Sequence, residues 1–318
     1  LLGDNMGFIE KEIEYLSSNK IETIHAKIFI PKSYAKFNGI VQISHGMCEY
    51  VDKYKNFIEF LTNNGYIVCG NDHLGHGKYV ERENRGFFAD ENGYKYLVED
   101  VYKLTKLVKK EYKDLPYFLF GHSMGSFIAR CYMYKHGDKI DGFIIMGTGY
   151  KNKLVDAGIK LADMIIARKG KMYRSIMLTD MVIGEFNKKF RPNVSKYDWL
   201  SSDESMLPWY VSDKIGDFDF TASGYKDLFK LNKNCNLLKN VEKIPKEKNI
   251  FLLSGNDDPV GDNGRGVLQV YHDLISTGHI NVFIKLYPNL RHELLNEVSK
   301  DDIYMDILCW LNKVKNKL

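Results

Sequence analysis

Cysteine is scarce in this sequence, and its spacing suggests no pairing. The 318 residues include five cysteines that are far apart and contain no Cys-x-x-Cys pair: Cys48, Cys69, Cys131, Cys235 and Cys309. Disulfide frameworks and structural zinc sites need even numbers or close pairs of cysteines, so the sequence predicts neither. We expect reduced and mostly buried thiols.

Long apolar runs are also missing, and the charge is balanced. No run approaches the roughly 18 residues of a membrane span, and residues 1–6 show no basic segment that leads into an apolar core. The 45 Lys and Arg residues are scattered among 41 Asp and Glu residues, which gives a net charge of +4. Because there is no basic stripe, nucleic acid is not an expected partner. Since the sequence shows neither a membrane span nor a leader pattern, the cytoplasm is the expected compartment.

The sequence does contain a regular succession of strand and helix patterns. Two alternating segments, residues 8–15 and 23–29, predict an antiparallel hairpin. Apolar runs separated by helical patterns then predict strands at residues 40–44, 66–70, 117–120, 142–146, 250–254 and 282–287, and a closing helix near residues 303–314. This order predicts an α/β fold with a mostly parallel, twisted sheet covered by helices on both faces.

A long insertion interrupts this alternation. The alternation stops after Gly149 and resumes near Lys248, so we assign residues 1–147 and 248–318 to one core domain and residues 148–247 to a helical lid. Apolar helical patterns in the lid cover residues 154–167 and 176–183. A lid placed over the strand ends would exclude water and bind an apolar chain.

A Gly-His-Ser-Met-Gly motif at residues 121–125 lies between an apolar run and a helical pattern. In that setting it is typical of a nucleophile elbow, where a serine occupies a sharp strand-to-helix turn. Its glycines, Gly121 and Gly125, let strand and helix approach each other without a Cβ clash. The motif therefore makes Ser123 the candidate nucleophile.

An acid and a histidine follow this serine in the chain order expected for such a site. The predicted strand at residues 250–254 leads into a loop with two adjacent acids, and we favour Asp258, with Asp257 as the alternative. His292 follows the last predicted strand and is the candidate base. The predicted catalytic triad is Ser123, Asp258 and His292.

Main-chain N–H groups are expected to stabilise the negative charge that develops on a substrate oxygen when the serine attacks. The residue after the nucleophile, Met124, supplies one of them, and the loop after an early strand supplies the other. That loop follows the predicted strand at residues 40–44, where Gly46 permits a tight turn. We therefore expect the N–H of Met47 to be the second donor.

Several motifs together resemble the monoacylglycerol lipase and lysophospholipase-like serine hydrolases of the α/β-hydrolase superfamily, which are often grouped with serine aminopeptidases. They are His-Gly-Met-Cys-Glu at residues 45–49, Asn-Asp-His-Leu-Gly-His-Gly at 71–77, the elbow at 121–125, Asp-Pro-Val at 258–260 and Arg-His-Glu at 291–293. The resemblance covers almost the whole chain. Tyr50, Leu74 and the pair Lys78-Tyr79 depart from the usual family pattern beside the catalytic groups.

The resemblance implies an α/β-hydrolase fold and the hydrolysis of fatty-acid esters. Monoacylglycerol or lysophospholipid is the favoured substrate class, although the family also holds carboxylesterases and thioesterases. The implied mechanism needs no metal and no organic cofactor. The expected partner is a small acyl ester, lipid in character, and we expect the lid to make transient contact with a membrane surface.

Two other functions remain open from the sequence alone. An aminopeptidase or amidase would need an acid in the pocket to hold a substrate ammonium group, and Glu185, Asp203 or Glu204 in the insertion could supply it. A scaffold that binds a ligand without catalysis is also compatible with the fold, because fold alone does not fix function.

Overall fold

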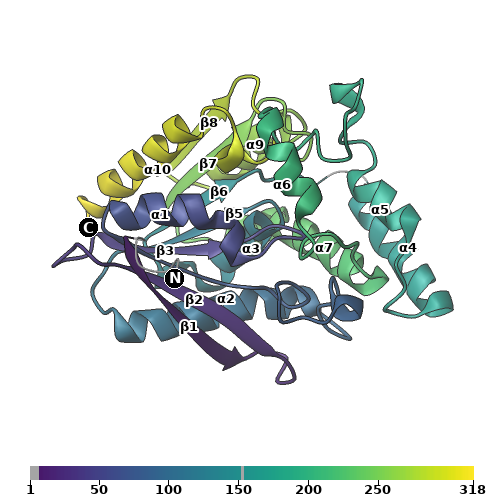
Figure 1. Cartoon of the computed structure of the whole chain (residues 1–318), viewed down its shortest axis with the longest axis horizontal. Helices are drawn as coiled ribbons and strands as arrows, with labels where there is room; N and C mark the ends of the chain where they lie inside the picture. Colours follow the sequence, from purple (N-terminus) through teal and green to yellow (C-terminus); the bar gives the residue numbers. More distant parts are fainter. Residues whose placement is uncertain (1–6, 152–153) are drawn as a thin grey trace.

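The computed structural model describes residues 7–151 and 154–318. A central sheet is built from β1 (Phe8–Leu16), β2 (Thr23–Pro31), β3 (Gly39–Ser44), β4 (Tyr66–Asn71), β5 (Tyr117–His122), β6 (Gly142–Met146), β7 (Asn249–Gly255) and β8 (Val282–Tyr287). The eight strands lie in the order β1-β2-β4-β3-β5-β6-β7-β8 (Figure 1). β2 pairs antiparallel with β1 and β4, and the other pairs are parallel. The predicted hairpin and mostly parallel sheet are confirmed.

Helices cover both faces of the sheet. One face carries α1 (Lys55–Asn63) and α10 (Lys300–Lys315), and the other carries α2 (Gly93–Glu111), α3 (Met124–His136) and α9 (Arg265–Ser276). Along β5, Tyr117 and Leu119 join the core beneath α2 and α3, whereas Phe118 and Phe120 join the core beneath α1 and α10. Because both faces of this strand are buried, its first four residues, 117–120, form a continuous apolar run.

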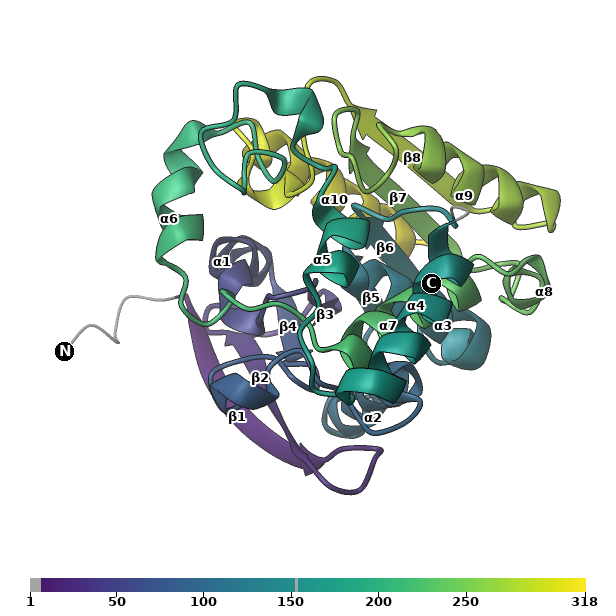
Figure 2. The same cartoon turned by 90° about the vertical axis from the view of Figure 1, so that its right-hand side faces the viewer.

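The chain between β6 and β7 is mainly helical. It contains α4 (Leu154–Lys169), α5 (Ile176–Ile183), α6 (Leu207–Ser212), α7 (Ala222–Cys235) and α8 (Leu238–Val241). In Figure 2, α4, α5 and α6 lie in front of the sheet. The helix predicted at residues 176–183 coincides with α5, and the one predicted at residues 154–167 ends two residues before the end of α4.

A buried arginine of α3 joins the start of this insertion to the end of α7. Arg130 donates from Nη1 to Thr148 Oγ1 (3.3 Å) and to Gly149 O (3.0 Å), where the insertion begins. Its Nη2 donates to Cys235 O (3.2 Å) and to Asn236 Oδ1 (2.5 Å), at the end of α7. α7 is itself largely buried and packs against α3. The last part of the insertion is therefore held on the core, against the helix that follows Ser123.

Candidate active site

Ser123 occupies the turn between β5 and α3 in a strained backbone conformation. Its φ of 53° and ψ of −121° lie in a region that residues with a side chain rarely adopt. The flanking glycines are required by close packing, because a Cβ on Gly125 would lie 1.9 Å from Ser44 O and a Cβ on Gly121 would lie 2.5 Å from Gly125 O. This local geometry is that of a nucleophile elbow.

His292 and Asp258 form a buried pair. His292 Nδ1 lies 2.9 Å from Asp258 Oδ1, and the side chains are only 2% and 0% exposed. Asp258 Oδ1 also accepts a hydrogen bond from the Val260 N–H (2.9 Å), which orients the carboxylate. A carboxylate at Nδ1 selects the tautomer with its proton on that nitrogen, so Nε2 is left to accept a proton.

The structure places Asp257 elsewhere. Asp257 Oδ1 pairs with Lys189 Nζ at 2.6 Å on a partly exposed surface. Of the two adjacent acids, the favoured one thus lies against His292, and the alternative does not. Two other late histidines, His272 and His279, do not line the cavity that contains Ser123 and His292.

Two main-chain N–H groups belong to residues near Ser123: Met47 in the loop after β3, and Met124, the first residue of α3. Met47 and Met124 line the same cavity as the serine, and neither of their N–H groups donates to another residue in the described part of the chain. Gly46 allows the close approach, because a Cβ there would lie 3.0 Å from Ser123 Cβ and 2.7 Å from Glu49 Oε2. The arrangement leaves both N–H groups available to an oxygen of a ligand.

Buried histidines hold this loop in place. His45 Nδ1 bonds to Gly46 O (2.9 Å), and His45 Nε2 accepts from the His73 N–H (3.0 Å). His76 Nε2 accepts from the Cys48 N–H (3.2 Å). Burial lowers the pKa of His73 to about 3 and that of His76 to about 4, so both rings stay neutral. A neutral His76 ring keeps the lone pair that the loop needs.

A charged group lies at one side of the cavity. Glu49 Oε2 accepts from the Gly46 N–H (2.5 Å) and the Tyr54 hydroxyl (2.6 Å), and it lies 3.2 Å from His122 Nδ1. Burial opposes ionisation of Glu49, but His122 and then Lys53 outweigh it and lower its pKa to about 2. Burial likewise opposes the charged form of His122, whereas Glu49 raises its pKa.

The charged end of the cavity, which we define as Glu49, Lys53, Asp213 and Glu293, joins the core to the insertion. Lys53 Nζ lies 3.0 Å from Asp213 Oδ2, and Glu293 accepts a hydrogen bond of 2.7 Å from the Tyr210 hydroxyl. Sequence reasoning missed this group. Glu49 and Glu293 fall within the motifs at residues 45–49 and 291–293, whereas Lys53, Tyr210 and Asp213 carry no local signal.

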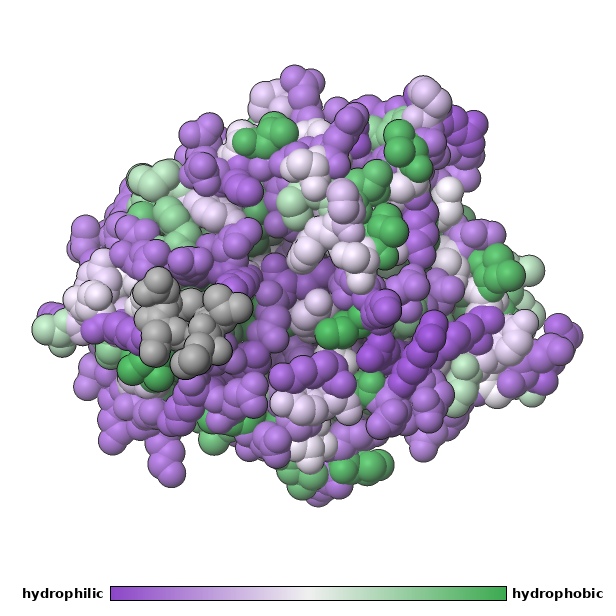
Figure 3. Space-filling model, in the orientation of Figure 1, coloured by the Kyte–Doolittle hydropathy of each residue, from purple (hydrophilic) through white to green (hydrophobic). Residues whose placement is uncertain are grey.

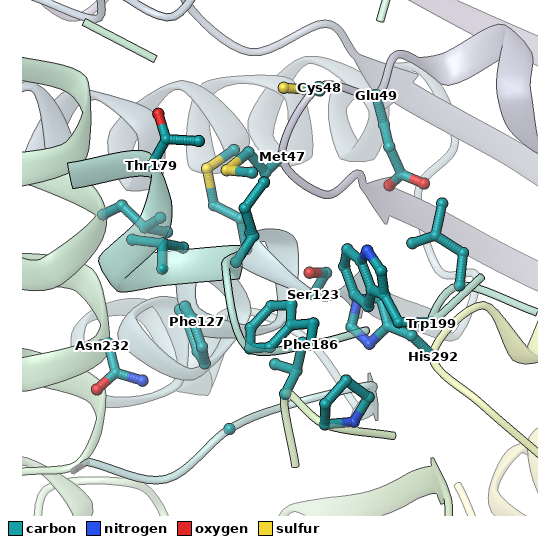
Figure 4. Close-up of a pocket in the computed structure, with 18 of the residues that line it drawn as sticks. Met47, Cys48, Glu49, Ser123, Phe127, Thr179, Phe186, Trp199, Asn232 and His292 are labelled. Carbon is teal, nitrogen blue, oxygen red and sulfur yellow. The ribbon is translucent and has the colours of Figure 1, made fainter. Parts of the chain in front are cut away.

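The rest of the cavity is mainly apolar. The whole cavity has a volume of about 1500 Å³, and Ser123 and His292 are among the residues that line it. Figure 4 shows Glu49 and Phe127 on opposite sides of Ser123, with the rings of Trp199 and His292 next to the serine. Apolar lining side chains come from α3, α4, α5 and α7 and the segments around them: Phe127, Val155, Met181, Val182, Ile183, Phe186, Leu228 and Phe229.

The acids proposed for an ammonium site are not gathered at the serine. Glu185 lines the cavity and pairs with Lys188. Asp203 accepts from the Ser205 N–H (3.0 Å) and caps its own turn, and neither Asp203 nor Glu204 lines the cavity. Within residues 7–151 and 154–318, no group of three His, Cys, Asp or Glu side chains is placed to hold a metal ion.

An apolar and cationic surface lies on α4 and α5. Ile176 is 80% exposed and Met177 is 60% exposed, Met164 is also exposed, and the exposed cations Arg168 and Lys169 end α4. Figure 3 shows apolar residues on the side of the molecule where Figure 1 places these helices. None of the helices that the structure describes is long and apolar enough to cross a bilayer.

The strand order and the serine at the end of β5 define the class of protein. A mostly parallel sheet in this order, with a strained serine between a central strand and its helix, is an α/β-hydrolase fold. A sequence model of the family described as serine aminopeptidase, S33, matches residues 35–299. The chain belongs to this family.

Individual relatives narrow the class. The chain is similar to the monoglyceride lipase of Saccharomyces cerevisiae, with 28% identity over 294 residues that cover 86% of this chain and 85% of that protein. A carboxyl esterase from Bacillus coagulans, in complex with glycerol, has a TM-score of 0.90 at 30% identity and covers 96% of this chain and 99% of its own. A lipase in an open form has a TM-score of 0.86 at 27% identity, covering 97% and 100%. The chain is thus a monoglyceride lipase-like serine hydrolase, and its relatives support ester hydrolysis.

Proposed function

We propose that this protein hydrolyses carboxylic esters of fatty acids through Ser123, His292 and Asp258, with monoacylglycerol or lysophospholipid as the substrate class. One observation carries the proposal. Ser123 and His292, which is paired with the buried Asp258, line the same cavity, which is mainly apolar on one side of the serine and charged on the other. That division matches a substrate with a long apolar acid and a polar alcohol.

In the first half of the reaction, Ser123 Oγ attacks the acyl carbonyl carbon while His292 Nε2 takes the hydroxyl proton. The carbonyl oxygen becomes an anion that accepts hydrogen bonds from the N–H groups of Met47 and Met124. Asp258 stabilises the imidazolium that forms. His292 then passes its proton to the departing alcohol, and an acyl-serine remains.

Water completes the reaction. His292 takes a proton from a water molecule, which attacks the acyl-serine and forms a second oxyanion at the same two N–H groups. When this intermediate collapses, His292 returns the proton to Ser123 Oγ and the fatty acid leaves. Every step uses side chains and main-chain groups of this chain.

The two sides of the cavity take the two parts of the substrate. The acyl chain lies along the apolar lining from α3, α5 and α7, where each buried CH₂ contributes up to about 0.8 kcal/mol. The charged end offers hydroxyl groups of the alcohol both acceptors, at Glu49 and Glu293, and a donor, at Lys53.

The exposed surface of α4 and α5 delivers the enzyme to its lipid. Ile176 and Met177 enter the apolar layer of a bilayer, and Arg168 and Lys169 contact anionic head groups. The double change Ile176→Glu and Met177→Glu should abolish sedimentation with anionic phosphatidylglycerol vesicles and leave hydrolysis of soluble p-nitrophenyl butyrate intact. Ile280→Glu, at an equally exposed site elsewhere, is the control.

The direct test is a substrate panel with the wild type and Ser123→Ala. It comprises p-nitrophenyl esters from C2 to C16, a 1-monoacylglycerol, lysophosphatidylcholine and an aminoacyl p-nitroanilide. Efficiency should rise with acyl length until the apolar side is filled, and Ser123→Ala should be silent. Preferred cleavage of the anilide would instead support an aminopeptidase, for which Glu185 is the one proposed acid that lines the cavity.

A further inference from the structure

Trp199 belongs to the insertion, yet its ring lies against His292. The ring centroids of indole and imidazole are 5.0 Å apart, with the planes inclined by 36° (Figure 4). The ring of His122 lies 4.8 Å from that of His292, and a Cβ on Gly147 would lie 3.0 Å from His292 Cε1. The imidazole is thus confined by two aromatic rings and by main chain.

This confinement adds a constraint that Asp258 cannot supply. The hydrogen bond to Nδ1 fixes one atom of His292, but it leaves the ring able to pivot about that atom. A base that takes a proton from a serine must be held within about 0.5 Å and 10–20° of its working geometry. Contact with a broad, rigid ring restricts the pivot, which is the effect expected of Trp199.

The position of the tryptophan is itself set by the histidine loop. Leu200 O accepts from the Glu293 N–H (2.7 Å), and Ser201 O accepts from Arg291 Nη1 (3.0 Å). The two residues after the tryptophan therefore bond to the two residues that flank the histidine. The segments that bear Trp199 and His292 are therefore hydrogen-bonded to each other, although they lie far apart in the sequence.

Phe186 is a matched comparison for Trp199, because it lines the cavity but has no ring contact with His292 in the described part of the chain. Its ring lies 4.8 Å from that of Trp199, and both side chains line the cavity. Of the two, only Trp199 has a ring contact with His292 among the described residues. Phe186 thus shares the surroundings of Trp199 without its contact to the histidine.

We propose that Trp199 is a positioning residue that holds the His292 ring in its working orientation toward Ser123. The proposal rests on the serine-esterase function proposed above. Its consequence is that part of the insertion contributes to the chemistry itself, for substrates of every length. A residue that only lined the acyl site would affect long chains alone.

The test compares Trp199→Leu, Trp199→Phe and Phe186→Leu on p-nitrophenyl acetate and p-nitrophenyl dodecanoate, together with the rate of fluorophosphonate labelling. Trp199→Leu should lower kcat by on the order of tenfold or more on both esters and slow labelling to match, because small misplacements of a catalytic group are costly. Trp199→Phe should recover most of the loss. Phe186→Leu should lower efficiency on the dodecanoate only. Trp199→Met provides a second non-aromatic replacement in case Trp199→Leu folds poorly.

Two results would overturn the proposal. One is a wild-type kcat on acetate in Trp199→Leu or Trp199→Met with a loss confined to dodecanoate. The other is an equal loss on acetate in Phe186→Leu. Failure of the proposed function is recognised separately, because the wild type would then resist fluorophosphonate and hydrolyse neither ester.

Discussion

The Tyr210 hydroxyl donates a hydrogen bond of 2.7 Å to Glu293, the residue that directly follows His292. Both side chains are buried. Tyr210 lies on α6 of the insertion, and Glu293 belongs to the core, so this bond joins the two at the edge of the active site. The ion pair between Lys53 and Asp213 joins the same two parts a short way along the cavity.

Removing the hydroxyl of Tyr210 should destabilise the fold. Among the described residues, Tyr210→Phe leaves the Glu293 carboxylate with one hydrogen-bond donor, Asn296 Nδ2. A buried hydrogen bond to a charged group contributes about 1.5–3 kcal/mol. We expect the free energy of unfolding, measured in urea, to fall by about 2 kcal/mol. Tyr34→Phe, which removes an exposed hydrogen bond to Asn63 O, is the matched control and should cost under about 1 kcal/mol. Equal effects of the two changes would contradict this account.

The two adjacent acids should differ sharply in their effect on catalysis. Asp258→Asn replaces the carboxylate at His292 Nδ1 and should lower kcat by about 10⁴-fold, because the wrong tautomer is then favoured. Asp257→Asn removes only an exposed pair with Lys189 and should leave kcat within about twofold. Steady-state hydrolysis of p-nitrophenyl butyrate measures both. Similar losses in the two variants would remove Asp258 from the triad.

The elbow should not tolerate a methyl group at Gly125. A Cβ there would lie 1.9 Å from the main-chain oxygen of Ser44, so strand β3 or helix α3 would have to shift. We expect Gly125→Ala to abolish fluorophosphonate labelling and to cost at least about 4 kcal/mol of stability. Gly278→Ala meets no atom within 4 Å and bears only the strain of a φ of +90°, so it should cost about 1 kcal/mol and keep full labelling. Labelled and folded Gly125→Ala protein would refute the packing argument.

Acid should weaken the fold through the buried histidines that hold the loop after β3. The pKa of His76 is about 4 in the folded protein and near 6.5 in an unfolded chain, so only the unfolded chain takes up the proton between those values. The stabilisation is complete above about pH 6.5 and is lost as the pH falls toward 4. Relative to His76→Gln, the free energy of unfolding of the wild type should decrease by about 1.4 kcal/mol per pH unit in this window.

The comparison of wild type with His76→Gln separates the effect of His76 from that of buried carboxyls, whose contribution to stability changes with pH in the opposite direction. Burial raises the pKa of Asp72 and of Asp227 to about 6, so these carboxyls favour the folded state as the pH falls, in wild type and variant alike. Urea unfolding of both proteins at several pH values from 7 to 4.5 supplies the measurement. If the difference in unfolding free energy between wild type and His76→Gln does not change with pH, then protonation of His76 does not contribute to acid destabilisation.

Most of the sheet can be predicted from the sequence because β3, β4, β5, β6 and β7 are short buried runs between turn residues, whereas β8 is only partly buried. β5 shows the limit of this prediction. The predicted strand stops at Phe120, whereas the observed strand continues through Gly121 and His122. Those two residues carry no apolar signal, and they are held in the sheet by pairing with β6. Local pattern therefore identifies the strands, and tertiary pairing sets their ends.

The candidate site can be predicted only as far as its motifs reach. Ser123 and His292 stand at recognisable positions, but the choice between adjacent acids depends on the direction of two side chains, which the sequence does not encode locally. The contact of Trp199 with His292 joins two distant segments through a ring contact. No residue pattern within either segment predicts this contact.

Arg130 ties two distant points of the insertion to the helix that follows Ser123. Its guanidinium binds Thr148 and Gly149 where the insertion leaves the core, and Cys235 and Asn236 at the end of α7, before α8 and the return to β7. Because one side chain of α3 holds both points, the segment between them is a closed loop, and Trp199 lies within it. Exchanging the whole loop would therefore also remove the contact of Trp199 with His292. A graft between these two points would have to keep Trp199 in place against His292.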